Sequence, residues 1–110
     1  MAGISYEEVE ALALAMSDTE PSLSYRTPCV KRKGKLMVRY RPDIEALVVR
    51  TDWERHDELL ERLEVFKTDH YEGWPYVLVS LADLGHDLAK ELLQVSWEAA
   101  PNKDKRRPLA

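Results

Sequence analysis

Apolar residues recur along this chain with two different periods, and the change of period predicts where helices and strands lie. In the first part, Val9, Ala13 and Met16 follow the spacing of one face of an α-helix. Ser5 and Glu8 precede them with the spacing of a capping box, in which each side chain bonds to the other residue's backbone N–H. We therefore expect the first helix to begin directly after Ser5.

The middle of the chain alternates with a period of two, which is typical of β-strands. Residues 17–24 are polar and contain a proline, so we expect a loop there. Lys33 and Gly34 separate two alternating stretches, which indicates a tight β-hairpin turn. The strands predicted in this part are residues 25–31, 36–41 and 46–50.

Alternation within the strand over residues 36–41 also predicts which side chains share a face of the sheet. One face is expected to carry Leu36, Val38 and Tyr40. The other face is expected to carry Met37, Arg39 and Arg41, which would make that surface of the sheet positive.

The second half of the chain returns to helical spacing. Thr51 opens a second capping box, with Asp52 as a competing cap, and we expect this helix to run to about Leu63. Asp83 is expected to cap a last helix, which Pro101 ends. The remaining strands are predicted over residues 65–71 and 75–81.

These elements follow one another in the order α-β-β-β-α-β-β-α, and their short connections favour antiparallel pairing. The predicted fold class is a two-layer α+β domain with a five-stranded, mostly antiparallel sheet and three helices. Residues 1–100 form this single domain in our interpretation. Residues 101–110 are basic, and we expect them to be a flexible C-terminal tail.

Three stretches of the chain also carry motifs of a known family. They are Val30–Val38, Phe66–Pro75 with its Thr-Asp-His-Tyr-x-Gly-Trp-Pro motif, and Glu91–Trp97. On these residues, the part from Thr27 to Ala100 resembles the MmcQ/YjbR family of small bacterial proteins. The resemblance implies an α-β3-α-β2-α fold. Members are commonly labelled DNA-binding because their fold resembles a double-wing DNA-binding domain, so the resemblance also implies a DNA-binding protein.

Positive charge is concentrated between Arg26 and Arg41, in a chain whose formal net charge is −4. Such a concentration favours contact with an anionic partner, and a two-stranded ribbon fits a groove of B-DNA. We therefore predict that DNA, or another polyanion, binds to this basic hairpin. Alternatives are an ordinary solvated turn, edge lysines that prevent aggregation, or another acidic partner. The predicted contact residues are Lys31, Arg32, Lys33, Lys35, Arg39 and Arg41.

A second candidate site is the segment around Gly73. His70, Tyr71 and Trp74 could form a pocket for a small ligand or an unstacked base, because aromatic rings stack on bases. The alternative is a tight turn at Gly73, with Trp74 packed on the sheet and His70 hydrogen-bonded. A small-ligand-binding domain and a protein-interaction or chaperone-like domain are thus the alternatives to nucleic-acid binding.

No motif of catalysis or metal binding is present in the sequence, so we predict a protein that is not an enzyme and has no cofactor. His56, His70 and His86 lie far apart without metal-ligand spacing, and His56 falls on an apolar helix face. Cys29 could act as a nucleophile only beside a histidine such as His70. The more ordinary role for Cys29 is a small apolar residue in a strand.

The ends and the cysteine content predict where the protein works. The N-terminus has neither the basic start nor the apolar stretch of a signal peptide. No apolar run approaches the ~20 residues that span a bilayer. The lone Cys29 excludes an internal disulfide and fits a reducing compartment. We therefore expect a cytoplasmic protein without a membrane partner, as a monomer or weak homodimer.

Overall fold

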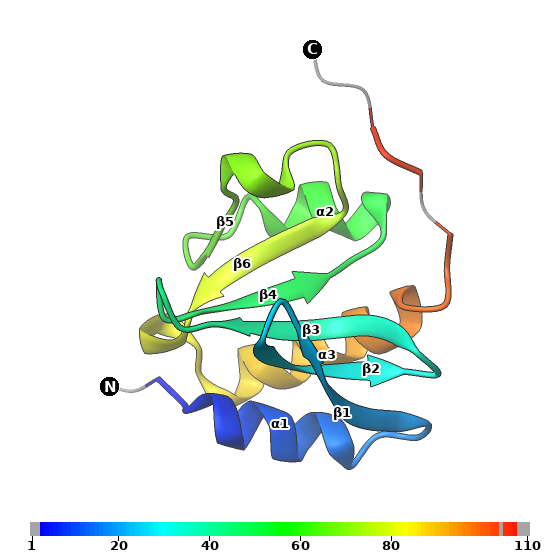
Figure 1. Cartoon of the computed structure of the whole chain (residues 1–110). Coiled ribbons are helices and arrows are strands. Elements are labelled where there is room, and N and C mark those ends of the chain that lie inside the picture. The colour runs from blue at the N-terminus through cyan, green and yellow to red at the C-terminus, as the bar shows by residue number, and fades with distance from the viewer. Residues whose placement is uncertain (1–2, 104, 108–110) are drawn as a thin grey trace.

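The computed structural model describes residues 3–103 and 105–107, arranged as a sheet with three α-helices (Figure 1). The α-helices are α1 (Tyr6–Leu14), α2 (Trp53–Leu59) and α3 (His86–Ala99). The strands are β1 (Thr19–Ser24), β2 (Thr27–Arg32), β3 (Lys35–Arg41), β4 (Ala46–Arg50), β5 (Val65–Phe66) and β6 (Tyr76–Ser80). Two short 3₁₀ helices, η1 (Asp69–Tyr71) and η2 (Leu81–Asp83), flank β6.

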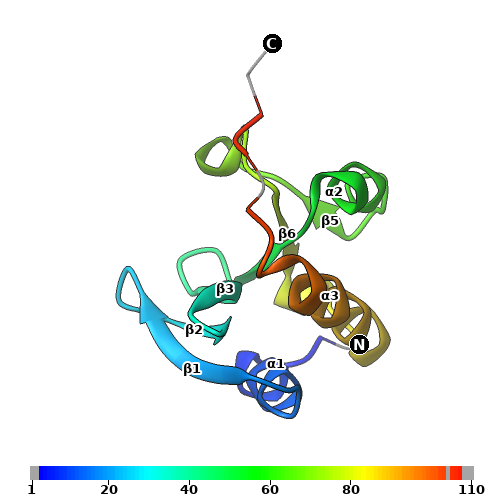
Figure 2. The ribbon, with the colours of Figure 1, turned by 90° about the vertical axis from the view of Figure 1, so that its right-hand side faces the viewer.

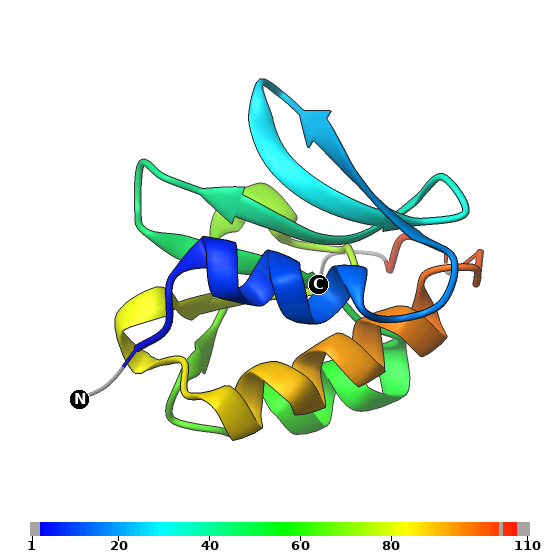
Figure 3. The ribbon, with the colours of Figure 1, turned by 90° about the horizontal axis from the view of Figure 1, so that it is seen from below.

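Every pair of neighbouring strands in the sheet is antiparallel, in the order β1-β2-β3-β4-β6-β5. Helix α1 packs against β1 and β2, α3 against β3 and β4, and α2 against β6. The three helices therefore cover one side of the sheet (Figures 2 and 3). The predicted two-layer α+β class is confirmed, although the sheet has six strands rather than five.

The strand that the sequence did not predict is β1, at one edge of the sheet. It was expected to be a loop, but it pairs with β2 along its whole length. An edge strand accommodates Pro21, which has no N–H to donate to a ladder. Tyr25 and Arg26, predicted to start the next strand, instead form the turn between β1 and β2 with φ angles of 51° and 66°. Such turns normally contain Asn or Gly, so the usual sequence signal is missing.

Several local predictions are confirmed. Ser5 caps α1 and forms the expected capping box with Glu8. Lys33 and Gly34 form the hairpin turn between β2 and β3, both with positive φ. Strand β4 has the predicted limits.

The predicted faces of β3 are wrong at its beginning, because the strand contains a β-bulge. Val30 of β2 lies opposite Val38, whereas Lys31 lies opposite Leu36. Strand β3 thus has one extra residue, Met37, between these pairs, which shifts the alternation. Met37 is fully buried in the core under the helices, and Leu36 lies on the opposite face.

The competing cap proves to be the one that begins α2. The Asp52 carboxylate accepts a hydrogen bond from the backbone N–H of Arg55 at 2.7 Å. Thr51 lies before the helix, is fully buried, and donates its hydroxyl to the carbonyl oxygen of Pro75 at 3.0 Å. The helix ends at Leu59, before the predicted end.

Two other predicted elements also have different limits. The strand predicted over residues 65–71 pairs only at β5, after which the chain leaves the ladder and forms η1. Gly85, rather than Asp83, occupies the N-cap position of α3, since Asp83 lies in η2.

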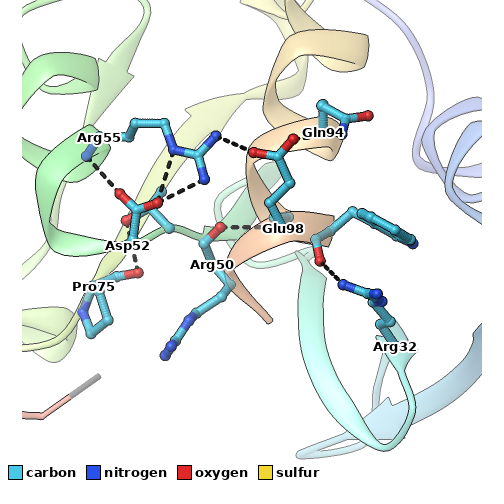
Figure 4. A network of polar contacts seen from close by, with 10 residues as sticks. Arg32, Arg50, Asp52, Arg55, Pro75, Gln94 and Glu98 are labelled. Atoms are coloured by element: carbon cyan, nitrogen blue, oxygen red, sulfur yellow. Dashed lines mark hydrogen bonds and ion pairs between the residues drawn. The ribbon is translucent and has the colours of Figure 1, made fainter. Parts of the chain in front are cut away.

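Polar contacts join α3 to the sheet and to α2 (Figure 4). The buried Ser96 hydroxyl lies 2.7 Å from the carbonyl oxygen of Met37 and 2.8 Å from that of Arg50. One side chain therefore bridges α3 to both β3 and β4. Arg55 of α2 donates to the Glu98 carboxylate of α3 at 2.7 Å, which fixes the two helices relative to each other.

Candidate nucleic-acid interface

The two faces of the sheet are buried by different elements, as β4 shows. Leu47 and Val49 contribute to the large core under the helices, whereas Ala46 and Val48 belong to a small cluster on the other face. In that small cluster, Tyr71 of η1 packs over β4 and β6. We call this second surface, away from the helices, the open face.

The open face is hollowed beside Tyr71. The hollow has a volume of about 330 Å³ and brings together the three predicted pocket residues. A second, wider hollow of about 660 Å³ adjoins it and extends to Arg41, Asp69 and Ile44. The two share Tyr25, Arg39 and His70. The ring-bearing side chains and the arginine of the smaller hollow are Tyr25, Arg39, His70, Tyr71, Trp74 and Tyr76.

Tyr25, which the sequence analysis did not single out, is 83% exposed at the rim of this hollow. Its φ of 51° lies in the left-handed region, which costs a residue with a side chain on the order of 1 kcal/mol. The turn thus keeps a strained residue and presents an aromatic ring to solvent. Strain of this kind is concentrated at functional sites, so Tyr25 is a candidate contact residue.

Arg39 is held firmly beneath Tyr25. Its Nε donates to the Thr27 hydroxyl at 2.8 Å, and its Nη1 donates to the Tyr71 hydroxyl at 3.0 Å. The guanidinium carbon lies 5.1 Å from the centre of the Tyr25 ring. Both hydrogen-bond partners are neutral, so the positive charge of Arg39 remains available to an anion.

Arg41 lies on the same face but is already paired. Two of its nitrogens donate to the Asp43 carboxylate at 2.6 and 3.0 Å. These bonds to Arg41 hold the pKa of Asp43 below its usual value. Arg41 is therefore a weaker candidate for an anion than Arg39.

Arg32 points to the helix side, where it contacts α3 (Figure 4). Its guanidinium stacks 3.5 Å from the centre of the Trp97 ring and donates to the carbonyl oxygen of Trp97 at 2.7 Å. Both contacts anchor the hairpin to α3. The predicted set of basic residues is therefore divided between the two sides of the sheet.

The side chains of the three hairpin lysines make fewer polar contacts than the arginines of the predicted set. Lys33 is 3.8 Å from the Asp18 carboxylate with an exposed side chain. Lys35 is exposed, and Lys31 shares the face of Leu36, its partner in the ladder, which lines the smaller hollow. Within the described residues, the side chains of Lys31 and Lys35 form no hydrogen bond or ion pair. Lys31 and Lys33 extend the positive charge of Arg39 to the tip of the hairpin, and Lys35 lies beside the tip, opposite Arg32 in the ladder.

His56 is buried, with 4% of its surface exposed. Its Nδ1 lies 2.8 Å from Asp57, and its Nε2 lies 2.6 Å from the amine of Lys67. Burial is the main cause that lowers the pKa of His56, and the positive charge of Lys67 adds to it. His56 is therefore a buried residue of the core, as its position on the apolar face of α2 indicates, and Lys67 is a partner that the spacing of the sequence does not reveal.

The described part of the C-terminal tail lies against α2 and the loop before β6. The Trp53 indole donates to the carbonyl oxygen of Lys105 at 2.8 Å. The backbone N–H of Arg107 donates to the carbonyl oxygen of Gly73 at 2.7 Å. Arg106 lies 5.7 Å from the centre of the Trp74 ring. Residues 104 and 108–110 of the predicted flexible tail lie outside the described residues.

The other candidates for chemistry remain separate. Cys29 is fully buried, and burial raises the pKa of its thiol. It has no hydrogen bond to a histidine within the described residues. Among those same residues, no three His, Cys, Asp or Glu side chains come together to hold a metal ion, and no helix is both long and apolar enough to cross a membrane.

A scan against protein-family models finds no match to this chain, and a search of curated proteins finds no similar sequence. The resemblance to the MmcQ/YjbR family therefore stays a prediction, and function has to be argued from the site itself.

Proposed function

We propose that this protein is a non-enzymatic module that binds single-stranded nucleic acid across the open face. The observation that carries the proposal is the exposed Tyr25 ring over the charged Arg39, at the rim of a hollow that also contains His70 and Trp74. In this arrangement one base stacks on Tyr25 while a neighbouring phosphate meets Arg39. Aromatic stacking contributes about 1–3 kcal/mol per base and needs no particular sequence.

The hairpin lysines supply further phosphate contacts in this proposal. Lys31 lies on the open face, Lys33 lies in the turn at the tip of the hairpin, and Lys35 follows the turn opposite Arg32. Together with Arg39 they would neutralise about four phosphates, which gives a slope of log affinity against log salt of about −3 for a single strand. Arg32 and Arg41 are left out, because Trp97 and Asp43 already hold them.

A single strand suits the open face better than a duplex. The hollow of about 330 Å³ is lined by aromatic side chains, on which the flat faces of bases can stack. In a duplex, the faces of the bases are stacked on one another and do not reach a protein surface. A duplex would therefore contact only the hairpin lysines and bind more weakly.

The test is fluorescence anisotropy with a labelled oligothymidine and a labelled duplex, each at low and moderate salt. We expect micromolar affinity for the single strand, weaker binding to the duplex, and a loss of both as salt rises. The double variant K33E/K35E should bind at least tenfold more weakly. Lys90, exposed on α3, offers the control K90E, which changes charge away from the open face.

Two results would contradict the proposal. One is an affinity of K33E/K35E equal to that of the parent. The other is an equal loss in K90E, because this would show that only the net charge matters.

A second candidate function is the binding of a small planar anion in the smaller hollow. It is favoured by the way Thr27 and Tyr71 fix Arg39 at the edge of a ring-lined space. Such a ligand would change the emission of Trp74, which is 42% exposed. Titration of nucleoside monophosphates with tryptophan fluorescence tests it, and the variant W74A should lose the response.

A further inference from the structure

A second group of reactive side chains lies between α2 and the segment from β5 to the loop before β6. Lys67 places its amine nitrogen 2.6 Å from Nε2 of His56 and 2.7 Å from the carbonyl oxygen of Trp74. The other ring nitrogen of His56 lies 2.8 Å from the Asp57 carboxylate. Asp57, His56 and Lys67 thus form a continuous chain of hydrogen bonds that the proposed binding function does not use.

The directions of these bonds follow from the chemistry of the partners. An ionised carboxylate only accepts, so Nδ1 of His56 carries the hydrogen and Nε2 presents its lone pair to Lys67. Lys67 then has two acceptors, Nε2 of His56 and the carbonyl oxygen of Trp74. A neutral amine has two hydrogens, and both would be donated, which leaves its own lone pair free. The third hydrogen of an ammonium has no further hydrogen-bond acceptor among the described residues.

Burial shifts Lys67 toward the neutral amine, whereas the Trp53 ring, whose centre lies 5.4 Å from the amine nitrogen, favours the ammonium. Lys67 is half-buried, and burial is the main cause that lowers its pKa. Arg107 of the tail adds to this effect, whereas Glu72 and Asp57 oppose it. Burial lowers the pKa of His56 too, so the ring is neutral and can accept a proton.

We propose that Lys67 is a nucleophilic lysine that takes an acyl group from an anionic acyl donor of the acyl phosphate class. The Lys67 nitrogen attacks the carbonyl carbon, so that a C–N bond forms and the C–O bond to the phosphate breaks. The phosphate leaves with the electron pair of that bond. The proton that the nitrogen loses passes to Nε2 of His56, and Asp57 stabilises the imidazolium that results.

An anionic donor fits the charges beside this amine. The Arg107 guanidinium stacks 3.9 Å from the centre of the Trp53 ring and lies 3.2 Å from Asp57. The tail also brings Arg106 to Trp74, whose carbonyl oxygen bonds Lys67. Arg107 is already paired with Asp57, so Arg106 beside Trp74 is the arginine that attracts a phosphate group to the rim of the cluster.

The test is incubation of the purified full chain with acetyl phosphate, followed by quantitative peptide mass spectrometry. Lys90 and Lys35 are exposed and serve as internal references in the same sample. We expect Lys67 to be acetylated several-fold faster than either reference. Its rate should also reach its plateau at a lower pH than theirs, because the pKa of Lys67 is lowered.

Two variants test whether the reactivity of Lys67 depends on His56 and Asp57 or only on how exposed its amine is. In H56Q the base is lost, and in D57N, at a more exposed position, only its orientation and charge support are weakened. The acetylation of Lys67 should slow strongly in H56Q and moderately in D57N, while that of Lys90 keeps its rate in both. Far-UV circular dichroism of both variants checks separately that they are folded. A Lys67 rate equal to that of Lys90 in the parent, or an unchanged Lys67 rate in D57N, would overturn the proposal.

Discussion

Two arginines of one hairpin lie over aromatic rings on opposite sides of the sheet, and their surroundings give them different roles. Arg32 is on the covered side, stacked on Trp97 and bonded to its backbone. Arg39 is on the open face, under the exposed ring of Tyr25 and bonded only to hydroxyl groups. On the covered side, the pair of Arg32 and Trp97 is shielded from solvent and contributes to stability. On the open face, the pair of Arg39 and Tyr25 is accessible to a ligand.

The largest expected difference between the two sides is in packing. L92A removes a fully buried leucine of α3 from the core and should lower the free energy of unfolding by about 3 kcal/mol. L36A, on the open face, leaves a partly exposed position and should cost only about 1 kcal/mol. Urea unfolding measures both. Equal losses would mean that the open face is covered in solution.

The next effect concerns the strained turn. Y25N replaces Tyr25 by a residue that adopts positive φ readily, so the free energy of unfolding should rise by about 0.5 kcal/mol. The same change removes a stacking ring, and affinity for oligothymidine should fall by about 2 kcal/mol. R26G relieves strain in the same turn, where φ is 66°, without removing the ring. If Y25N binds oligothymidine as tightly as the parent, Tyr25 has no role in binding.

The sequence was sufficient to predict the class of fold because most of its signals are local. The capping box of Ser5 and Glu8 and the turn at Lys33 and Gly34 need no distant partner, and both are present. Strand β1 was missed because its pairing depends on a turn without glycine and on an edge position that alternation does not reveal. The bulge at Met37 is likewise fixed by packing against the core.

The candidate site was predictable only in part, for the same reason. His70, Tyr71 and Trp74 are close in sequence, so a shared pocket could be predicted. Tyr25 comes from a distant turn, and its place beside Arg39 depends on the pairing of β1, β2 and β3. The charged hairpin was recognised as a cluster, but sequence alone did not reveal that Arg32 turns to the helices.

The two arginines themselves provide the next test. R32Q should lower the free energy of unfolding by about 1–2 kcal/mol, because it removes a stacked, hydrogen-bonded group, and should leave oligothymidine affinity unchanged. R39Q should weaken binding about fivefold, which corresponds to about 1 kcal/mol, with a smaller effect on unfolding. Thermal unfolding and anisotropy on both proteins give the comparison. The reverse pattern would place the ligand on the helix side.

The smallest effect is a pH dependence on the covered side, where His56 is buried. Since burial lowers its pKa in the folded protein, the unfolded chain binds more protons once the pH falls below the unfolded value of about 6.5. Stability that is fully present above that pH is therefore lost as the pH falls toward the folded pKa.

H56Q should flatten this part of a curve of unfolding free energy against pH. K67M should flatten it less, because Lys67 is only one of the causes that keep His56 neutral, the first being burial. A parent protein whose stability stays constant between pH 7 and 5 would show that the protonated ring of His56 is compensated in the folded state, for which the Asp57 carboxylate, 2.8 Å from Nδ1, is the negatively charged partner.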